Sequence, residues 1–260
     1  MERLALYTIS KDKITFDIDQ FSLFKHGEHE ATNFYALKLA KHFISSYKPH
    51  ECSEIVFASS AYRNIPVAAT LLTHLFIRHL EDLTGNKYKI MRLYRQNLTK
   101  GDFSTMSLAN RSRTMQSTKI KIKGRKHLKK NVVVIDDIII TGSHERRLQQ
   151  LFYGEDISSL TFLYLVEVLN VGEKTSFENE LNKANMNNWE QWLSLALKDP
   201  LVTVRFLKFL MQIDSQYYPK IIAALGKERC KSYKLCIKAD GLNKQFIENY
   251  KSLCTLLKMK

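Results

Sequence analysis

The chain has 260 residues, of which 45% are hydrophobic and 25% are charged, and its formal net charge is +14. This length is enough for one sizeable α/β domain with an extension, or for two small domains, and the composition is that of an ordinary globular protein. We expect a cytoplasmic protein with reduced thiols and no membrane contact, because no apolar run approaches the roughly 18 residues of a membrane span, the N-terminus does not resemble a signal peptide, and the four cysteines form no CxxC pair.

The N-terminal part of the chain alternates between the patterns of strands and helices. A short strand is expected at residues 3–9, and an amphipathic helix at 30–47, where apolar residues recur at helical spacing. A buried strand at 53–60 precedes a helix at 67–83, which ends at a Thr-Gly-Asn turn. Residues 87–95 alternate between apolar and polar side chains, which is typical of a further strand.

The middle of the chain holds a long polar segment and then the same alternation. Residues 96–118 have no clear period and are predicted to form a long loop or a mobile hairpin, and a loop of this length inside a compact domain is usually functional. The apolar run at 131–137 predicts a third core strand, which a helix at 143–152 and a strand at 158–170 follow. Strands and helices in this order predict an α/β fold with a mostly parallel sheet flanked by helices.

The remainder of the chain, from about residue 173, has a helical pattern to its end. Apolar stripes at helical spacing occupy four segments, 188–198, 201–213, 217–225 and 244–258. We therefore predict an α/β domain over residues 1–172 and an α-helical C-terminal extension over residues 173–260 that packs on it.

The positive charge is concentrated in one segment. Between residues 87 and 130, fourteen Lys and Arg residues accompany a single acid, Asp102. Within this segment, KIKIKGRKHLKK at 119–130 contains seven Lys and Arg residues, and its alternation of Lys with Ile also suits a hairpin at the edge of a sheet. So concentrated a field points to a polyanionic partner, either nucleic acid or a phosphorylated small molecule.

The sequence VVVIDDIIITGSH, residues 132–144, places two acids and a small-residue turn where the third core strand is expected to end. Ligands of open parallel sheets bind at the carboxyl ends of the strands. Gly142 allows a close backbone approach, and free N–H groups at the start of the next helix form an anion site. Because charged residues are seldom buried unpaired, Asp136 and Asp137 need hydroxyl groups or a metal, and a phosphorylated ribose with Mg²⁺ supplies both. The alternative is a buried strand capped by an acid pair in a surface turn.

This motif resembles the signature with which type I phosphoribosyltransferases bind 5-phosphoribosyl-1-pyrophosphate (PRPP): four apolar residues, two acids, a short apolar step and Thr-Gly-Ser/Ala-Thr. The chain departs from it at His144, where the signature has Thr. The resemblance implies that Asp136 and Asp137 hold the ribose, and that they bind Mg²⁺ indirectly, through the hydroxyls of PRPP or through water. It assigns the 5′-phosphate to Thr141, Gly142, Ser143 and His144.

The strand at 53–60 runs into ASSAYRNIP, at the place where these enzymes have their pyrophosphate loop. The resemblance implies that amides, hydroxyls and a guanidinium group hold pyrophosphate there. The residues that it assigns to this role are Ser59, Ser60, Tyr62, Arg63 and Asn64. The loop lacks glycine, unlike the common Arg-Gly-Gly form, and an ordinary surface loop is the alternative.

The polar segment at 96–118 corresponds to the flexible catalytic loop of the family. The sequence RQNLTKGDFSTMSLANRSR is similar to the matching stretch of ComF-like phosphoribosyltransferases, in which Gln, Leu and Arg precede a VDD-type signature. The resemblance implies that Lys100, Arg111 and Arg113 stabilise the developing charge of pyrophosphate while the loop excludes water. A solvated basic loop is the alternative. The resemblance extends over residues 1 to about 170 and not over the helical extension.

The resemblance implies a Mg²⁺-dependent phosphoribosyltransferase in which a nitrogen nucleophile, an unidentified base or amine, displaces pyrophosphate from C1 of PRPP with inversion. Catalysis would come mainly from positioning and charge stabilisation. Members of the family that use 6-oxopurines carry a carboxylate three residues past the second acid, and Ile140 at that position argues against this substrate class. Aromatic residues that would stack a base are Tyr62, Phe103 and the Trp189/Trp192 pair, although two Trp residues at i and i+3 also suit a helix core.

An alternative function on the same fold is that of a PRPP-sensing, nucleic-acid-binding regulatory or accessory protein of the ComF-like type. It is supported by residues 119–130, which are more basic than pyrophosphate requires. The chain has no helix-turn-helix or zinc-finger pattern, so we expect weak, non-specific binding of nucleic acid at most. The sequence leaves a homodimer open.

Overall fold

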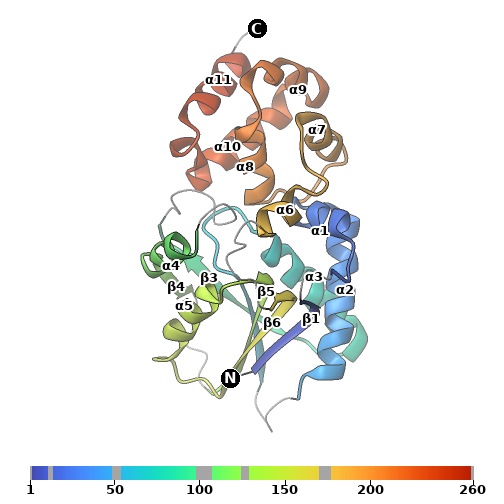
Figure 1. The fold of residues 1–260 in the computed structure, drawn as a ribbon, viewed down its shortest axis with the longest axis vertical. Helices are drawn as coiled ribbons and strands as arrows, with labels where there is room; N and C mark the ends of the chain where they lie inside the picture. Colours follow the sequence, from blue (N-terminus) through green and yellow to red (C-terminus); the bar gives the residue numbers. More distant parts are fainter. Residues whose placement is uncertain are drawn as a thin grey trace.

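The structure is a computed structural model that describes residues 2–10, 14–48, 54–97, 107–123, 129–169 and 177–258. For residues 108, 109, 111 and 112 it describes the backbone and not the side chains. It has two parts: a sheet with helices on both faces, and a bundle of helices from the C-terminal part of the chain, which lies beyond one end of the strands (Figure 1). None of the described helices combines the length with the apolar character that crossing a membrane requires.

The sheet has six described strands in the order β1-β6-β5-β2-β3-β4. Their bounds are Glu2–Ile9 for β1, Ile55–Ser59 for β2, Lys89–Arg95 for β3, Ile120–Lys123 for β4, Asn131–Ile139 for β5 and Ser159–Val168 for β6. All neighbouring strands pair parallel except β3 and β4, which pair antiparallel. The mostly parallel sheet confirms the predicted fold class, and β4 is an edge strand that carries lysines, as its alternation of Lys with Ile predicted.

Helices cover both faces of the sheet, because alternate side chains of a strand point to opposite sides. The first layer consists of α1 (Ile18–Lys25), α2 (His29–Ser46) and α3 (Ala68–Thr84), and the second of α4 (Leu108–Gln116) and α5 (Ser143–Phe152). In β5, Val133 and Ile135 join the core of the first layer, whereas Val132 and Val134 join the core that includes Leu148 of α5. The central strand is thus buried on both sides up to the point where its acids begin.

The C-terminal helices form a core of their own. They are α6 (Phe177–Lys183), α7 (Trp189–Leu197), α8 (Val204–Gln212), α9 (Tyr218–Leu225), α10 (Lys227–Asp240) and α11 (Ile247–Lys258), with short 3-10 turns at Ser215–Tyr217 and Leu242–Lys244. Helix α6 shares the core of the sheet through Leu181, and the others pack around Trp192, Phe206 and Tyr233. We keep residues 1–172 and 173–260 as the proposed division of the chain, with α6 at the contact between its two parts.

The bundle is fastened to the sheet part at the end of α1. The N–H of Leu201 donates to the carbonyl of Gly27 at 2.9 Å. Gly27 has a φ of +90°, and a Cβ atom there would overlap the carbonyl of Leu201, so glycine alone suits this contact. The neighbouring His26 packs edge to face on Phe209 of α8, and burial lowers the pKa of His26 to about 3. The junction is therefore closely packed and shielded from water.

Helix α4 occupies part of the segment that its pattern predicted to be a loop. Its sequence LANRSRTMQ has no apolar stripe, and Met115 is the one buried side chain among those described in this helix. Ser107 caps its start by accepting the N–H of Asn110 at 3.4 Å. Because this helix is stabilised by its cap and buries few side chains, its sequence has no periodic pattern of apolar residues from which it could be predicted. The patterns also do not predict α1, which has only eight residues, or the largely polar α10.

Candidate functional site

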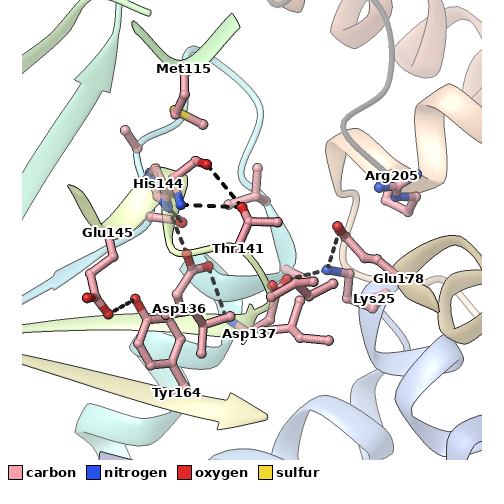
Figure 2. Close-up of a pocket in the computed structure, with 18 of the residues that line it drawn as sticks. Lys25, Met115, Asp136, Asp137, Thr141, His144, Glu145, Tyr164, Glu178 and Arg205 are labelled. Atoms are coloured by element: carbon pink, nitrogen blue, oxygen red, sulfur yellow. Dashed lines mark hydrogen bonds and ion pairs between the residues drawn. The ribbon is translucent and has the colours of Figure 1, made fainter. Parts of the chain in front are cut away.

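A pocket opens at the carboxyl ends of β2 and β5, between the sheet part and helix α8 (Figure 2). One side is formed by residues 136–145, from the end of β5 into α5, and by Ser60 and Ala61 after β2. The remaining walls consist of Lys25, Val67, Ala68, Arg95, Met115, Tyr164, Glu178, Val204, Arg205 and Lys208. The pocket therefore brings together the acid pair, the turn at 141–144 and Ser60.

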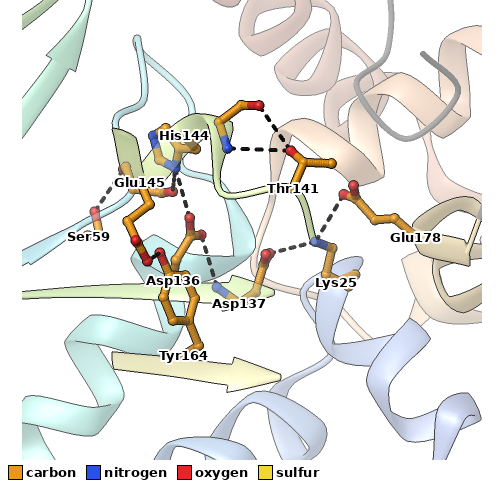
Figure 3. A network of polar contacts seen from close by, with 11 residues as sticks. Lys25, Ser59, Asp136, Asp137, Thr141, His144, Glu145, Tyr164 and Glu178 are labelled. Atoms are coloured by element: carbon orange, nitrogen blue, oxygen red, sulfur yellow. Dashed lines mark hydrogen bonds and ion pairs between the residues drawn. The ribbon is translucent and has the colours of Figure 1, made fainter. Parts of the chain in front are cut away.

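The two acids lie within β5 rather than after it, because the strand runs on to Ile139. Successive side chains of a strand point to opposite faces, so the two carboxylates diverge. Each meets a different basic side chain (Figure 3): Asp136 meets His144, and Asp137 meets Lys25. These partners offset the repulsion between neighbouring acids.

Asp136 is held by hydrogen bonds on both carboxylate oxygens. Its Oδ2 lies 2.9 Å from Nδ1 of His144, and its Oδ1 accepts the N–H of Asp137 at 2.9 Å. Burial opposes the charged form, but the hydrogen bond and charge of His144 hold the pKa of Asp136 below its ordinary value. Because a carboxylate only accepts, Nδ1 of His144 carries a proton. Nε2 of His144 is buried and has no hydrogen-bond partner among the described residues.

Asp137 is paired with a buried lysine that sequence reasoning missed. Lys25, the last residue of α1, is 5% exposed. Its Nζ lies 2.6 Å from Oδ2 of Asp137 and 3.9 Å from Oε1 of Glu178 in α6. Burial raises the pKa of Asp137, although the charge of Lys25 opposes the rise. Lys25 directly follows FSLF, in which three of the four residues are apolar. A lysine in such a setting could have been predicted to be buried and paired with an acid.

The turn between β5 and α5 has the geometry of an anion site. The Oγ1 of Thr141 lies 3.0 Å from Oγ of Ser143 and accepts its N–H at 3.4 Å. Gly142 has a φ of +66°, in the left-handed region that glycine favours. Helix α5 begins at Ser143, and Gly142 offers no side chain to cap the N–H groups of its first turn. Such a helix start suits a phosphate.

The residues assigned to a pyrophosphate loop separate in space, and Ser60 alone among them lines the pocket. The hydroxyl of Ser59 lies 3.2 Å from Oγ1 of Thr70 in α3. Tyr62 forms an isolated parallel bridge with Tyr94 of β3. The hydroxyl of Ser59 thus contacts α3, and the backbone of Tyr62 pairs with β3.

Arg63 and Asn64 contact the end of α10. The Nη1 of Arg63 donates to the carbonyl of Asp240 at 3.2 Å, and the N–H of Asn64 donates to the Asp240 carboxylate at 3.1 Å. Asp240 also accepts the N–H of Ile65 at 3.2 Å. In this structure the loop after β2 thus joins the sheet part to the bundle.

The cations assigned to the catalytic loop are described only in part. Lys100 and Phe103 lie outside the described residues, and Arg111 is described by its backbone in α4. Arg113 is exposed on α4 and does not line the pocket. Helix α4 reaches the pocket through Met115 instead (Figure 2).

Besides Lys25, three cations line the pocket that sequence reasoning did not assign to it: Arg95, Arg205 and Lys208. Arg95 ends the parallel strand β3, and burial lowers its pKa while the charge of Asp136 opposes this effect. Because Arg95 stands at the carboxyl end of a predicted strand, it could have been predicted from the sequence to line the site. Arg205 and Lys208 come from α8 in the bundle, and no local pattern links that helix to the site.

The two tryptophans belong to the bundle and not to the pocket. Trp192 is fully buried and stacks on Phe206, with ring centroids 4.8 Å apart. Trp189 stacks on Tyr217 with centroids 4.9 Å apart. Neither lines the pocket, so the alternative of a helix core holds for this pair.

The acid pair fits Mg²⁺ only as an indirect partner. Within the described part of the chain, no group of three His, Cys, Asp or Glu side chains converges in the way that a metal site requires. Asp136 and Asp137 diverge toward His144 and Lys25. A magnesium ion would therefore take its oxygen ligands mainly from a phosphorylated ligand and water, as it commonly does.

The sequence of the chain matches the model of one protein family. A model of the family described as PRTase ComF-like, that is, ComF-like phosphoribosyltransferases, matches residues 1–253. The match therefore continues into the helical bundle, beyond the limit near residue 170 that the motifs alone indicated. No curated protein sequence matches the chain.

Solved structures of phosphoribosyltransferases resemble the structure at low identity. A hypoxanthine phosphoribosyltransferase of Staphylococcus aureus has 16% identity and a TM-score of 0.37, with 54% of this chain and 65% of that chain covered. A hypoxanthine-guanine phosphoribosyltransferase of Bacillus anthracis has 18% identity and a TM-score of 0.37, with 61% and 75% covered. A hypoxanthine phosphoribosyltransferase of Trypanosoma cruzi has 15% identity and a TM-score of 0.36, with 53% and 65% covered. The chain thus spans slightly less than two thirds of the first and the third of these proteins.

Proposed function

Because the chain belongs to the ComF-like phosphoribosyltransferase family, we propose that it is a Mg²⁺-dependent phosphoribosyltransferase that uses PRPP. A nitrogen of the acceptor attacks C1 of the ribose, and a C1–N bond forms as the C1–O bond to pyrophosphate breaks. Pyrophosphate leaves with the bonding electrons, and the nitrogen loses a proton. The protein contributes mainly positioning and charge stabilisation.

The observation that supports this proposal is the convergence of the acid pair and the 141–144 turn in one pocket. In the proposal, the 5′-phosphate accepts N–H groups of the turn and of the start of α5. His144 contacts the same phosphate in this proposal, through its backbone N–H in the first turn of α5 or through a protonated ring nitrogen. Asp136 and Asp137 accept hydrogen bonds from the ribose hydroxyls, and through these hydroxyls or water they hold Mg²⁺.

Pyrophosphate lies in this proposal at the end of β2. Ser60 and Arg95 line the pocket there, and Mg²⁺, when bound, supplies positive charge to the pyrophosphate oxygens. The loop residues Lys100, Arg111 and Arg113 complete the proposed set of cations. Ser59, Tyr62, Arg63 and Asn64 stay proposed members of the pyrophosphate loop that act by holding its backbone.

Release of labelled pyrophosphate from PRPP, measured across a panel of nitrogenous bases and amines, tests the activity. We expect at least one acceptor to raise the release above the rate with PRPP alone, and chelation of Mg²⁺ to remove this increase. A protein that binds PRPP and releases no pyrophosphate with any acceptor would instead support the PRPP-sensing alternative.

That alternative, a PRPP-sensing, nucleic-acid-binding regulatory or accessory protein, is favoured by the surface of β4. Lys119, Lys121 and Lys123 are exposed at this edge of the sheet. The Nζ of Lys123 lies 4.1 Å from the centroid of the Tyr94 ring. Cations beside an aromatic ring at a solvent-facing edge are features of surfaces that bind single-stranded nucleic acid.

Salt titration of a labelled duplex and a labelled single strand measures this binding. If the lysines contact phosphates, the Lys121→Gln/Lys123→Gln variant should lower the slope of log K against log salt by about 1.8 on duplex DNA, about 0.9 for each contact. The control is Lys238→Gln/Lys258→Gln, which removes the same charge from the exposed bundle surface. Arg125 and Lys126, outside the described residues, are a second pair to neutralise. Wild-type protein that binds neither strand at low salt would remove the alternative.

A further inference from the structure

Helix α8 places two cations on the wall of the pocket opposite the phosphate turn. Arg205 and Lys208 both line the pocket, and their i, i+3 spacing puts them on one face of the helix. Arg205 lies across the pocket from His144 and Thr141 (Figure 2). It lies on the side of Lys25 and Glu178, where the Oε1 of Glu178 is 3.9 Å from the Nζ of Lys25. The helix itself, VRFLKFLMQ, contains no acid.

This wall is held in position by contacts that do not involve a ligand. The hydroxyl of Thr203 caps α8 by accepting the N–H of Phe206 at 3.1 Å, and it donates to the carbonyl of Lys25 at 3.4 Å. The N–H of Val204 donates to the carbonyl of Pro66 at 3.0 Å. The first turn of α8 is thus fixed to both α1 and the loop after β2, so the helix that carries the two cations is positioned in advance of binding.

The anionic groups of PRPP lie elsewhere under the proposed function. The 5′-phosphate occupies the turn beside His144, and pyrophosphate lies at Ser60, whose Oγ is 3.3 Å from Nδ1 of the same histidine. Both groups are therefore on the side of the pocket away from Arg205. The proposed function therefore assigns no group of PRPP to the α8 cations, and a guanidinium group pairs most strongly with a carboxylate or a phosphate.

We propose that Arg205 and Lys208 form a subsite for an acid group, a carboxylate or a phosphate, on the acceptor of the phosphoribosyl group. The inference rests on the proposed function, because an acceptor has a role only if PRPP is the other substrate. It narrows the acceptor from any nitrogenous base or amine to one that carries an anionic substituent.

Matched pairs of acceptors that differ in the acid group test the subsite. The carboxylate arm uses nicotinate with nicotinamide, and orotate with uracil; the phosphate arm uses phosphoethanolamine with ethanolamine. Each compound is titrated against the full chain in the presence of PRPP and Mg²⁺, and the melting temperature and the release of pyrophosphate are followed. We expect the acid member of at least one pair to bind at least about tenfold more tightly than its neutral counterpart, which is the scale of one charge-assisted hydrogen bond.

The variant Arg205→Gln/Lys208→Gln should bind the acid and the neutral member of each pair equally well. PRPP alone should still raise its melting temperature as it does in the wild-type protein. The control Lys238→Gln/Lys258→Gln should keep both the preference for the acid and this rise. The inference is overturned if no acid is preferred in any pair, including the case in which no compound binds, or if the α8 variant keeps the preference. Loss of the PRPP shift itself in a folded α8 variant also overturns it, because the cations then serve PRPP. If wild-type protein shows no shift with PRPP, the proposed function fails, which is a separate result.

Discussion

Replacing Asp136 and Asp137 together by Asn is expected to abolish the rise in melting temperature that PRPP with Mg²⁺ gives the wild-type protein. The two carboxylates accept the ribose hydroxyls in the proposed complex, and an amide provides a weaker acceptor without charge. A ligand present at 100 times its Kd contributes about 2.7 kcal/mol to the free energy of unfolding, and this contribution should disappear in the variant.

The comparison requires a folded variant and a matched control. Circular dichroism and a cooperative melting transition establish folding in the absence of PRPP. Glu228→Gln/Glu248→Gln makes the same change of charge at two exposed acids of the bundle and should keep the full shift. An undiminished PRPP shift in the folded Asp136→Asn/Asp137→Asn protein would mean that PRPP is not bound at β5.

The acid pair and the phosphate turn could be predicted because their signals are local. An apolar run, two carboxylates, Gly142 and the start of a helix all fall within residues 131–152, and each restricts the backbone over a few residues. The alternation of strands and helices predicted the parallel sheet for the same reason. The sequence did not show that β5 continues past Asp137 to Ile139. Isoleucine suits a strand and a short apolar stretch before a turn equally, so Ile138 and Ile139 fitted either structure.

The partners of these groups could not be predicted, because they depend on long-range contacts. Lys25 lies 112 residues from Asp137 along the chain and reaches it through α1, whose eight residues have no clear periodic signal. Arg205 reaches the pocket only because the bundle docks on the sheet part. An asparagine at position 64 could donate hydrogen bonds to pyrophosphate. In the structure, however, the backbone N–H of Asn64 donates to the carboxylate of Asp240, which lies 176 residues away in sequence.

Lys25→Met is expected to destabilise the protein by about 3 kcal/mol or more at pH 7.5, the scale for removing one member of a buried ion pair. Lys25 and Asp137 are both largely buried and 2.6 Å apart, so the variant leaves an uncompensated carboxylate beside Asp136. Urea unfolding at pH 4.5, 6.0 and 7.5 measures the loss. The free energy difference between wild type and variant should grow as the pH rises.

The direction follows from the pKa of Asp137, which burial already raises above that of the unfolded chain although Lys25 opposes the rise. A carboxyl group with a raised folded-state pKa loses stability as the pH climbs from its unfolded pKa, near 4, through its folded pKa. Without Lys25 the folded pKa of Asp137 rises further, so this loss is larger and extends to higher pH. The double variant Lys25→Met/Asp137→Asn removes both charges and should recover most of the stability at pH 7.5. A loss that is equal at all three pH values, or no recovery in the double variant, would show that Lys25 contributes by packing rather than as the counterion of Asp137.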